Sequence, residues 1–79
     1  PQAPRRFMLR VQQVAQEYGL TPKETEVFTL AAKGRTTQRI REELGLSTGT
    51  VNTHLAHIYK KLDVHDRQQM LDLVEAKEE

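Results

Sequence analysis

The sequence predicts an all-α fold with four helices from residue 21 onward and one leading helix before them. Apolar residues recur at intervals of three and four in five segments, which is the spacing of a helix that buries one face, and no strand pattern appears. A residue able to cap a helix N-terminus precedes each of the four later segments. The length of 79 residues suits one domain, near the lower end of what folds without a metal or disulfides.

The leading helix is expected over residues 5–18, and Gly19 can end it in a left-handed conformation. Residues 1–4 are expected to form an unstructured lead-in. Two interpretations of residues 1–19 stay open: an extra helix packed on the domain, or the end of a linker from a missing upstream domain. The apolar pattern of this segment consists of Phe7, Leu9, Val11, Val14, Ala15 and Tyr18.

The second helix has a sharper start signal. Thr21 is a suitable N-cap, Pro22 takes the first helical position, and Glu24 can return a hydrogen bond to the cap, so that the three form a capping box. The helix is expected to end before Gly34, with Lys33 near its negative end. Its residues expected to face the core are Val27, Phe28, Leu30 and Ala31.

A helix-turn-helix is expected around Gly45. Thr36 or Thr37 can cap a short helix that runs to about residue 44, and Gly45 can take the positive φ of the turn that follows. Leu46 then anchors the chain just before the next cap. Two helices joined by such a turn form the unit whose second helix enters the DNA major groove. The inward-facing residues of the short helix are Ile40 and Leu44.

The second helix of this pair, expected behind the N-cap Ser47 and ending at Leu62, has two different faces. One is an apolar stripe with spacings of four, three and four, which is suited to burial. The other offers amides, hydroxyls and cations, and the stretch contains no acid, so this face is able to lie in a nucleic-acid groove. The stripe is Val51, Leu55, Ile58 and Leu62, and the other face carries Asn52, Thr53, Ala56, His57, Tyr59 and Lys60.

The last helix is expected to begin at the N-cap Asp66, with Gln69 completing a second capping box. It should fray at residues 77–79. Its broad apolar face consists of Met70, Leu71, Leu73 and Val74.

Charge and composition narrow the possible functions. Residues 1–62 carry ten Lys and Arg against five Asp and Glu (+5), whereas residues 63–79 carry two against six (−4), as suits a basic body that meets a polyanion and a last helix that points elsewhere. The absence of cysteine excludes disulfides and thiolate sites. No signal peptide or membrane-spanning run is visible. Because the chain starts at Pro1 rather than methionine, we expect it to be a fragment of a longer protein.

The sequence resembles the LuxR-type (GerE-like) helix-turn-helix DNA-binding domain over roughly residues 20–76, without a gap. The specific element is the run Thr50-Val51-Asn52-Thr53-His54. The residues that carry the rest of the resemblance are Leu20 to Glu24, Glu26, Val27, Gly34, Ile40, Leu44, Ser47, Ile58, Lys61, Leu62, Val64 and Arg67.

The resemblance implies a four-helix domain at the C-terminus of a bacterial transcription regulator. It implies binding to a double-stranded operator with two half-sites, usually as a two-fold dimer, and an upstream sensor or receiver domain. The expected location is the cytoplasm, either free or as the cytoplasmic tail of a membrane-anchored regulator. Residues 1–19 would be a linker or leading helix, 20–76 the DNA-binding domain, and 77–79 the frayed end.

The residue types on the exposed face suggest individual roles. Asparagine can bond adenine at two positions and a threonine methyl can touch the thymine methyl, so Asn52 and Thr53 are expected to read bases, with Ala56 allowing close approach. Expected phosphate contacts are Ser47, Thr48, Thr50, His57, Lys60 and Lys61. The expected dimer contacts are Met70, Leu73 and Val74.

Two departures from the family pattern are visible. Arg41 stands where the family commonly has a small alanine, so the packing of the short helix is in doubt. The groove face has Asn52, Thr53 and Ala56 where lysine or arginine is frequent. The operator sequence of a relative therefore does not transfer to this chain.

Other function classes fit the residues less well. His54 and His57 are spaced as metal ligands on one helix face would be, but no third ligand accompanies them, so no metal or other cofactor is expected. Glu24, Glu42 and Glu43 occupy a cap and a solvated face without a nucleophile or a phosphate loop, so no enzyme is expected. A helical protein–protein dimerisation module without DNA binding remains the alternative.

Overall fold

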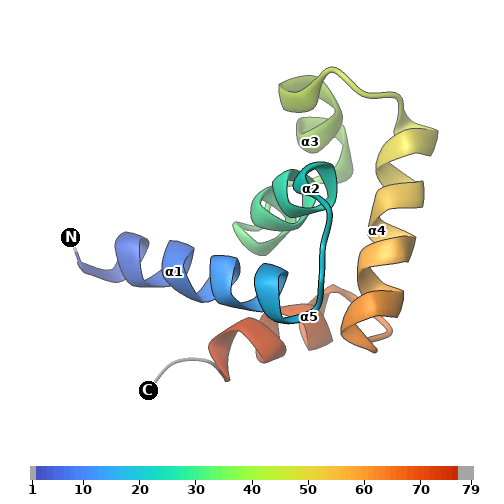
Figure 1. Ribbon diagram of the computed structural model, residues 1–79. Helices are drawn as coiled ribbons and strands as arrows, with labels where there is room; N and C mark the ends of the chain where they lie inside the picture. Colours follow the sequence, from blue (N-terminus) through green and yellow to red (C-terminus); the bar gives the residue numbers. More distant parts are fainter. Residues whose placement is uncertain (1, 77–79) are drawn as a thin grey trace.

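The computed structural model describes the backbone of residues 2–76 and the side chains of residues 6–76. This part of the chain forms five helices and no strand, which confirms the all-α prediction (Figure 1). The lead-in expected for Pro1 and the fraying expected for residues 77–79 lie outside the described residues. The helices are α1 (Gln2–Glu17), α2 (Pro22–Ala32), α3 (Thr37–Leu44), α4 (Thr48–Leu62) and α5 (Arg67–Glu75).

The starts of the helices follow from their capping residues. In the capping box of α2 the Glu24 N–H donates to Thr21 Oγ1 at 3.1 Å, and the Thr21 N–H donates to Glu24 Oε1 at 3.0 Å. Thr36, rather than Thr37, caps α3. The second expected box is only half present, because Asp66 caps Gln69 but the Gln69 side chain accepts from the N–H of His65, one residue before the cap.

Four helices are followed, within two residues, by a residue with positive φ. These residues are Gly19 after α1, Gly34 after α2, Gly45 after α3 and Asp63 after α4. After α4, the Asp63 N–H donates to Lys60 O at 3.2 Å and the Val64 N–H donates to Tyr59 O at 3.0 Å. These two bonds satisfy the last carbonyl groups of α4. Asp63 is the only residue among 2–76 to hold this conformation with a side chain, at φ 58°.

Replacing Asp63 with glycine should therefore stabilise the domain by about 0.5–1 kcal/mol. Glycine takes positive φ without steric cost, and the change removes a carboxylate from the negative end of α4, although a more flexible unfolded chain offsets part of the gain. Urea unfolding followed by circular dichroism measures the effect. Gly45→Ala is the matched control: a Cβ there meets no atom within 4 Å, so its expected loss of about 1 kcal/mol reports backbone strain alone. A lower free energy of unfolding for Asp63→Gly than for the parent would contradict the prediction.

The leading segment is a helix packed on the domain. α1 contacts α2 and α5, and its Val11 and Val14 are fully buried. The expected unstructured lead-in is wrong for residues 2–4, since the helix already begins at Gln2; Pro4 lies in its first turn, where no backbone N–H is required. The expected apolar role of Leu9 is also wrong, because its side chain is 59% exposed.

α2 lies at the centre of the fold and contacts each of the other four helices (Figure 1). Its Val27, Phe28 and Ala31 are fully buried, as expected, whereas Leu30 is only partly buried. Arg67, at the start of α5, donates from Nη1 to the backbone carbonyls of Ala31 at 3.4 Å and Arg35 at 2.5 Å. A cation thus stabilises the negative end of α2 and ties α5 to it.

Two of the three dimer contacts expected on α5 are wrong. Met70 and Val74 are both 0% exposed, so neither offers surface to a second copy. The physical reason is that Met70 and Val74 lie one turn apart on the face of α5 that packs into the core, where α5 contacts α1 and α2. Leu73 remains available: it is partly buried and lines an open groove. The other residues of the groove are Tyr18, Leu62, Asp63, Val64, Gln69 and Asp72.

Candidate nucleic-acid interface

α4 forms one edge of the molecule, with one side against α2 and α3 and the other free (Figure 1). Its apolar stripe is buried as the spacing predicts, with Val51 and Ile58 fully inaccessible. Ser47 caps the helix by accepting the Thr50 N–H at 3.1 Å. Cap and stripe together fix which side of α4 faces outward.

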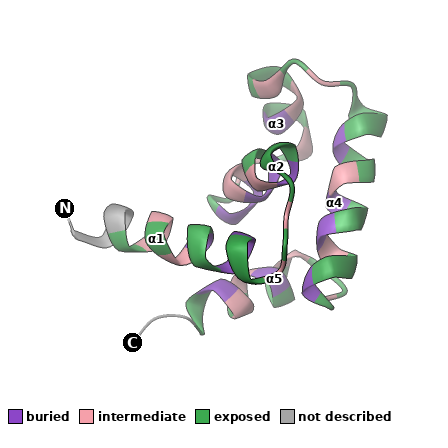
Figure 2. Ribbon diagram, in the orientation of Figure 1, coloured by how far each residue is buried: buried purple, intermediate pink, exposed green. Residues whose placement is uncertain are grey.

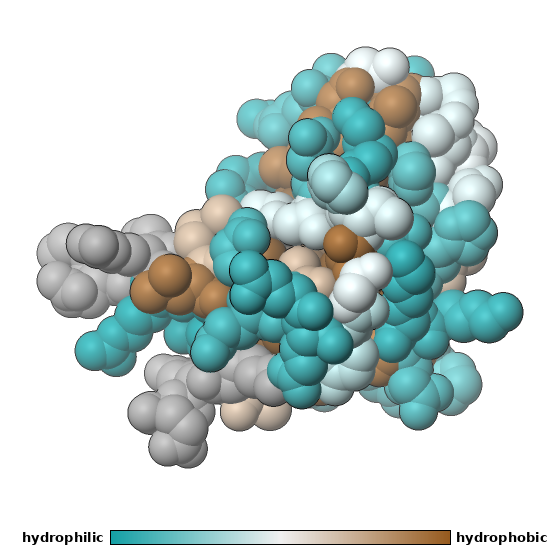
Figure 3. Space-filling model, in the orientation of Figure 1, coloured by the Kyte–Doolittle hydropathy of each residue, from teal (hydrophilic) through white to brown (hydrophobic). Residues whose placement is uncertain are grey.

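The outward side of α4 is mostly exposed (Figure 2). Asn52, Thr53, Ala56, His57 and Lys60 are all exposed, and their spacing places them on one side of a helix. Near-white and hydrophilic atoms dominate this edge in Figure 3. With no acid between residues 48 and 62, the surface presents hydrogen-bonding groups, the Lys60 cation and the methyl group of Ala56.

The N-terminal end of α4 adds hydroxyl groups to this surface. Ser47, Thr48 and Thr50 are exposed. The Ser47 hydroxyl also donates to Thr50 Oγ1 at 2.9 Å, which leaves the Thr50 hydroxyl proton free to donate outward. The first N–H groups of a helix point the same way and favour an anion.

Lys61 has a partner within the protein. Its Nζ lies 2.7 Å from Glu24 Oε1 and 3.3 Å from the Gly19 carbonyl oxygen. The Glu24 side chain is only 6% exposed, so the pair joins the N-terminal end of α2 to the C-terminal half of α4. The phosphate contact expected of Lys61 is thus not favoured by its position, since the ammonium is turned toward α2.

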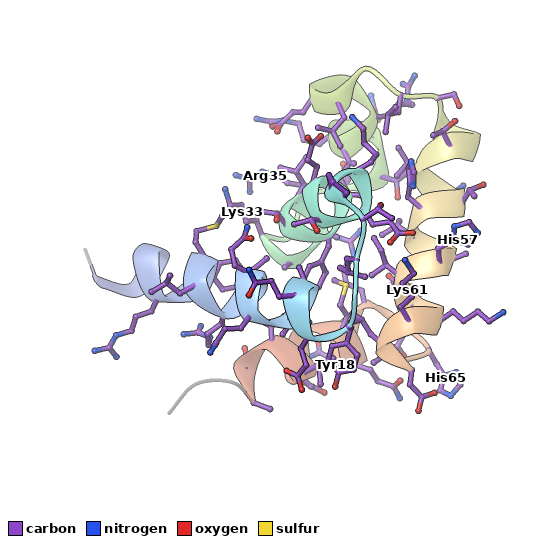
Figure 4. All side chains as sticks on the ribbon, in the orientation of Figure 1. Tyr18, Lys33, Arg35, His57, Lys61 and His65 are labelled. Carbon is purple, nitrogen blue, oxygen red and sulfur yellow. The ribbon has the colours of Figure 1, made fainter. Side chains whose placement is uncertain are left out.

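His57 faces the same carboxylate. Its Nδ1 lies 3.9 Å from Glu24 Oε2, and its side chain is 60% exposed. Figure 4 shows His57 and Lys61 one turn apart on α4. Glu24 therefore contacts the capping residue of its own helix and two residues of α4.

Two opposing effects act on the Glu24 carboxyl group. Burial on its own would raise the pKa of Glu24, but the hydrogen bonds from Lys61 and the Thr21 N–H, together with the charges of Lys61 and His57, outweigh it. The pKa of Glu24 consequently lies below its ordinary value of 4.5. The group is a carboxylate at neutral pH and holds its partners by charge-assisted hydrogen bonds.

The remaining candidates are placed as follows. Tyr59 is half-buried, as expected of a packing residue, and His54 is half-buried beside the stripe. Within the described residues there is no group of three or more side chains suited to holding a metal ion, and no helix there is long and apolar enough to span a membrane.

Sequence reasoning missed the second role of Glu24 and the role of Arg67. The capping-box pattern explains Glu24 completely from its neighbours, whereas Lys61 is 37 residues away in the chain. Arg67 is 36 residues from Ala31. No local signal in the sequence marks a pair at such separation.

The comparisons with known proteins agree with this geometry. Residues 18–74 match the family described as bacterial regulatory proteins, luxR family. The chain is 48% identical over 50 residues to transcriptional regulatory protein LiaR of Bacillus subtilis, covering 63% of this chain and 24% of LiaR. It is 41% identical over 61 residues to the uncharacterized transcriptional regulatory protein YvfU of the same organism, covering 77% and 30%.

A third relative, the uncharacterized response regulatory protein YgeK of Escherichia coli, is 44% identical over 52 residues, covering 66% of this chain and 35% of YgeK. The chain thus spans between a quarter and about a third of the length of these relatives. No solved structure was found to match it.

Proposed function

Because the chain belongs to the luxR family of bacterial regulatory proteins and has that family's DNA-binding domain, we propose that α4 enters the major groove of an operator and that two copies pair there. The observation that carries the proposal is the exposed, acid-free side of α4, held outward by its buried stripe. The family is one of DNA-binding regulators and not a class of enzymes. By analogy with the relatives, the domain is the output part of a longer regulator acting in the cytoplasm, with a sensor or receiver region upstream.

Base reading falls to the middle of the exposed side. Asn52 can bond adenine N6 and N7, the Thr53 methyl can contact a thymine methyl, and Ala56 lets the helix approach closely. Contacts of this kind discriminate by about 1–3 kcal/mol each. The side carries no arginine, the residue best suited to guanine, so we expect modest specificity per half-site and a strong dependence on pairing.

Phosphate contacts frame this reading surface. Thr50 supplies an outward hydroxyl at the N-terminal end, with Ser47 and Thr48 beside it. Lys60 supplies a cation farther along, and His57 supplies an exposed imidazole beside it. Lys61 supports DNA binding indirectly, because its ion pair with Glu24 holds α4 against α2.

Pairing involves the outer side of α5. Leu73 is the remaining member of the expected contact set, and the groove that it lines extends from α5 to Tyr18 of α1. Two α5 helices that meet about a two-fold axis would present their α4 helices to successive major grooves, about one helical turn apart. Exposed acids at Asp66 and Asp72 oppose this contact, so pairing is expected mainly on DNA.

The salt dependence of DNA binding tests the proposal. Lys60→Ala should weaken binding to all duplexes about equally, by roughly tenfold per copy at 0.1 M salt, and should reduce the slope of log K against log salt by about one. Fluorescence anisotropy with labelled duplex at several salt concentrations measures both quantities.

Lys33→Ala is the matched control for this measurement. It removes the same charge from the far side of α2, away from α4 (Figure 4), and should leave the slope unchanged. An unchanged slope in Lys60→Ala would remove Lys60 from the contacts. No binding at low salt, with helical content intact, would instead favour the protein–protein interaction module.

A further inference from the structure

We propose that Glu24 is a positioning residue for DNA binding: it orients His57 so that the imidazole bridges this buried carboxylate and a DNA phosphate, and binding takes up a proton there. The inference rests on the proposed function and adds a regulatory property, a dependence of affinity on pH. Glu24 does not touch the DNA in this arrangement and acts through His57.

The geometry of the carboxylate carries the first step. Oε1 accepts from the Thr21 N–H at 3.0 Å and from Lys61 Nζ at 2.7 Å. Oε2 faces His57 Nδ1 at 3.9 Å. One oxygen thus fixes Glu24 on the scaffold, and the other is directed to a residue of the exposed side of α4.

The geometry of the imidazole carries the second step. The contact between Nδ1 and the Glu24 carboxylate is electrostatic at 3.9 Å, and it favours the ring orientation and the tautomer that turn an N–H toward Glu24. Nδ1 faces Glu24, so Nε2, across the ring, points away from the carboxylate. His57 is 60% exposed and shares its side of α4 with Thr53 and Lys60, so Nε2 is available to a phosphate at the groove edge.

The third step concerns which charged groups can pair with His57. On α2, Lys23 is engaged with Glu26 at 3.3 Å, and on α3, Arg39 is engaged with Glu43 at 2.7 Å. On α4 itself Lys61 is held by Glu24 and Lys60 is exposed. Among the described residues, Glu24 is thus the charged group that lies within ion-pair distance of His57.

A phosphate on the other side would put the ring between two anions. Both anions favour the imidazolium, and the exclusion of water by DNA strengthens both attractions. Lys60 and Lys61 oppose protonation, and the ion pair with Lys61 offsets part of the attraction that Glu24 exerts on the ring, so the phosphate supplies the larger share of the effect. The free domain presents only one of the two anions, so protonation should increase when DNA binds.

The experiment is isothermal titration calorimetry with random-sequence duplex DNA at low salt, near pH 7, in two buffers of different ionisation enthalpy. The difference in apparent enthalpy gives the number of protons taken up. We expect uptake approaching one per copy, and affinity that rises by up to about tenfold per pH unit as pH falls from 8 to 6. His57→Gln should bind more weakly and lose the uptake, whereas His65→Gln, at the connection after α4 (Figure 4), should retain it.

Glu24→Gln tests the positioning role, because it keeps the oxygen that accepts the Thr21 N–H and removes the charge. Its proton uptake should fall clearly below that of the parent, and the Glu24→Gln, His57→Gln double variant should match His57→Gln alone. A role in folding only would leave the proton count of the folded variant unchanged. Uptake equal to the parent in folded Glu24→Gln, or no uptake in the parent, would overturn the inference.

Nitrogen-15 NMR of the imidazole in the unaltered domain keeps the inference testable if Glu24→Gln does not fold. The neutral ring should carry its proton on Nδ1, toward Glu24, and a proton on Nε2 would overturn the inference. DNA binding without proton uptake rejects this inference alone, whereas absence of any DNA binding rejects the proposed function.

Discussion

Phe28→Ala should cost about 3–5 kcal/mol of folding free energy, which is most of the stability expected of a domain of this size. Phe28 is among the largest fully buried side chains and lies on α2, the helix that contacts all the others. Its removal leaves a cavity inside the core cluster, and close packing prevents the surrounding side chains from closing it completely. Thermal and urea unfolding followed by circular dichroism measure the loss.

The control for Phe28→Ala is Leu9→Ala on α1. Leu9 is 59% exposed, so its truncation should change stability by less than about 0.5 kcal/mol. Leu9→Ala also removes apolar carbons, although fewer of them, so most of the difference between the two variants should come from the burial of Phe28. A cost below about 1 kcal/mol for Phe28→Ala would mean that α2 is not the centre of the core.

Glu24→Ala should cost about 2–3 kcal/mol at pH 7. The variant loses the bond to the Thr21 N–H and leaves the Lys61 ammonium without its carboxylate; the partial exposure of Lys61 keeps the cost below that of a fully buried pair. The same change should also loosen α4 against α2, so its effect on DNA affinity is expected to exceed that of an equally destabilising core variant.

The cost of Glu24→Ala should depend on pH in a defined direction. The pKa of Glu24 is lower in the folded domain than its ordinary value of 4.5, so its contribution is fully present above about that pH. It is lost as pH falls through the folded value, because protonation then removes the charge that binds Lys61. Urea unfolding at pH 7, 5, 4 and 3 should show the stabilities of parent and variant converging in acid.

Glu26→Ala is the matched control for this series. Glu26 pairs with Lys23 at 3.3 Å, but both side chains are about half exposed, so its loss should cost under about 0.5 kcal/mol at any of these pH values. A difference between parent and Glu24→Ala that stays constant down to pH 3 would show that the carboxylate charge does not stabilise the fold.

The bounds of α2 to α5 and the face that α4 buries could be predicted from the sequence, whereas the start of α1 could not. The predicted cap Ser47, the stripe from Val51 to Leu62 and the left-handed turn at Gly45 are all confirmed. The physical reason is that a cap bonds an amide three residues away and a helical stripe repeats every three to four residues. Such signals lie within one or two turns of chain.

Only the tertiary structure decided how each apolar or charged side chain is used. Leu9 belongs to the apolar pattern of α1 but is exposed. Met70 and Val74 were expected at a dimer interface but are buried in the core of the domain. Lys61 fits a phosphate contact but pairs with Glu24. A periodic pattern shows that a face is apolar or charged, and which element covers that face depends on contacts between residues far apart in the chain. The exposed side of α4 was thus evident from its residues, whereas the buried carboxylate that pairs with Lys61 was revealed only by the fold.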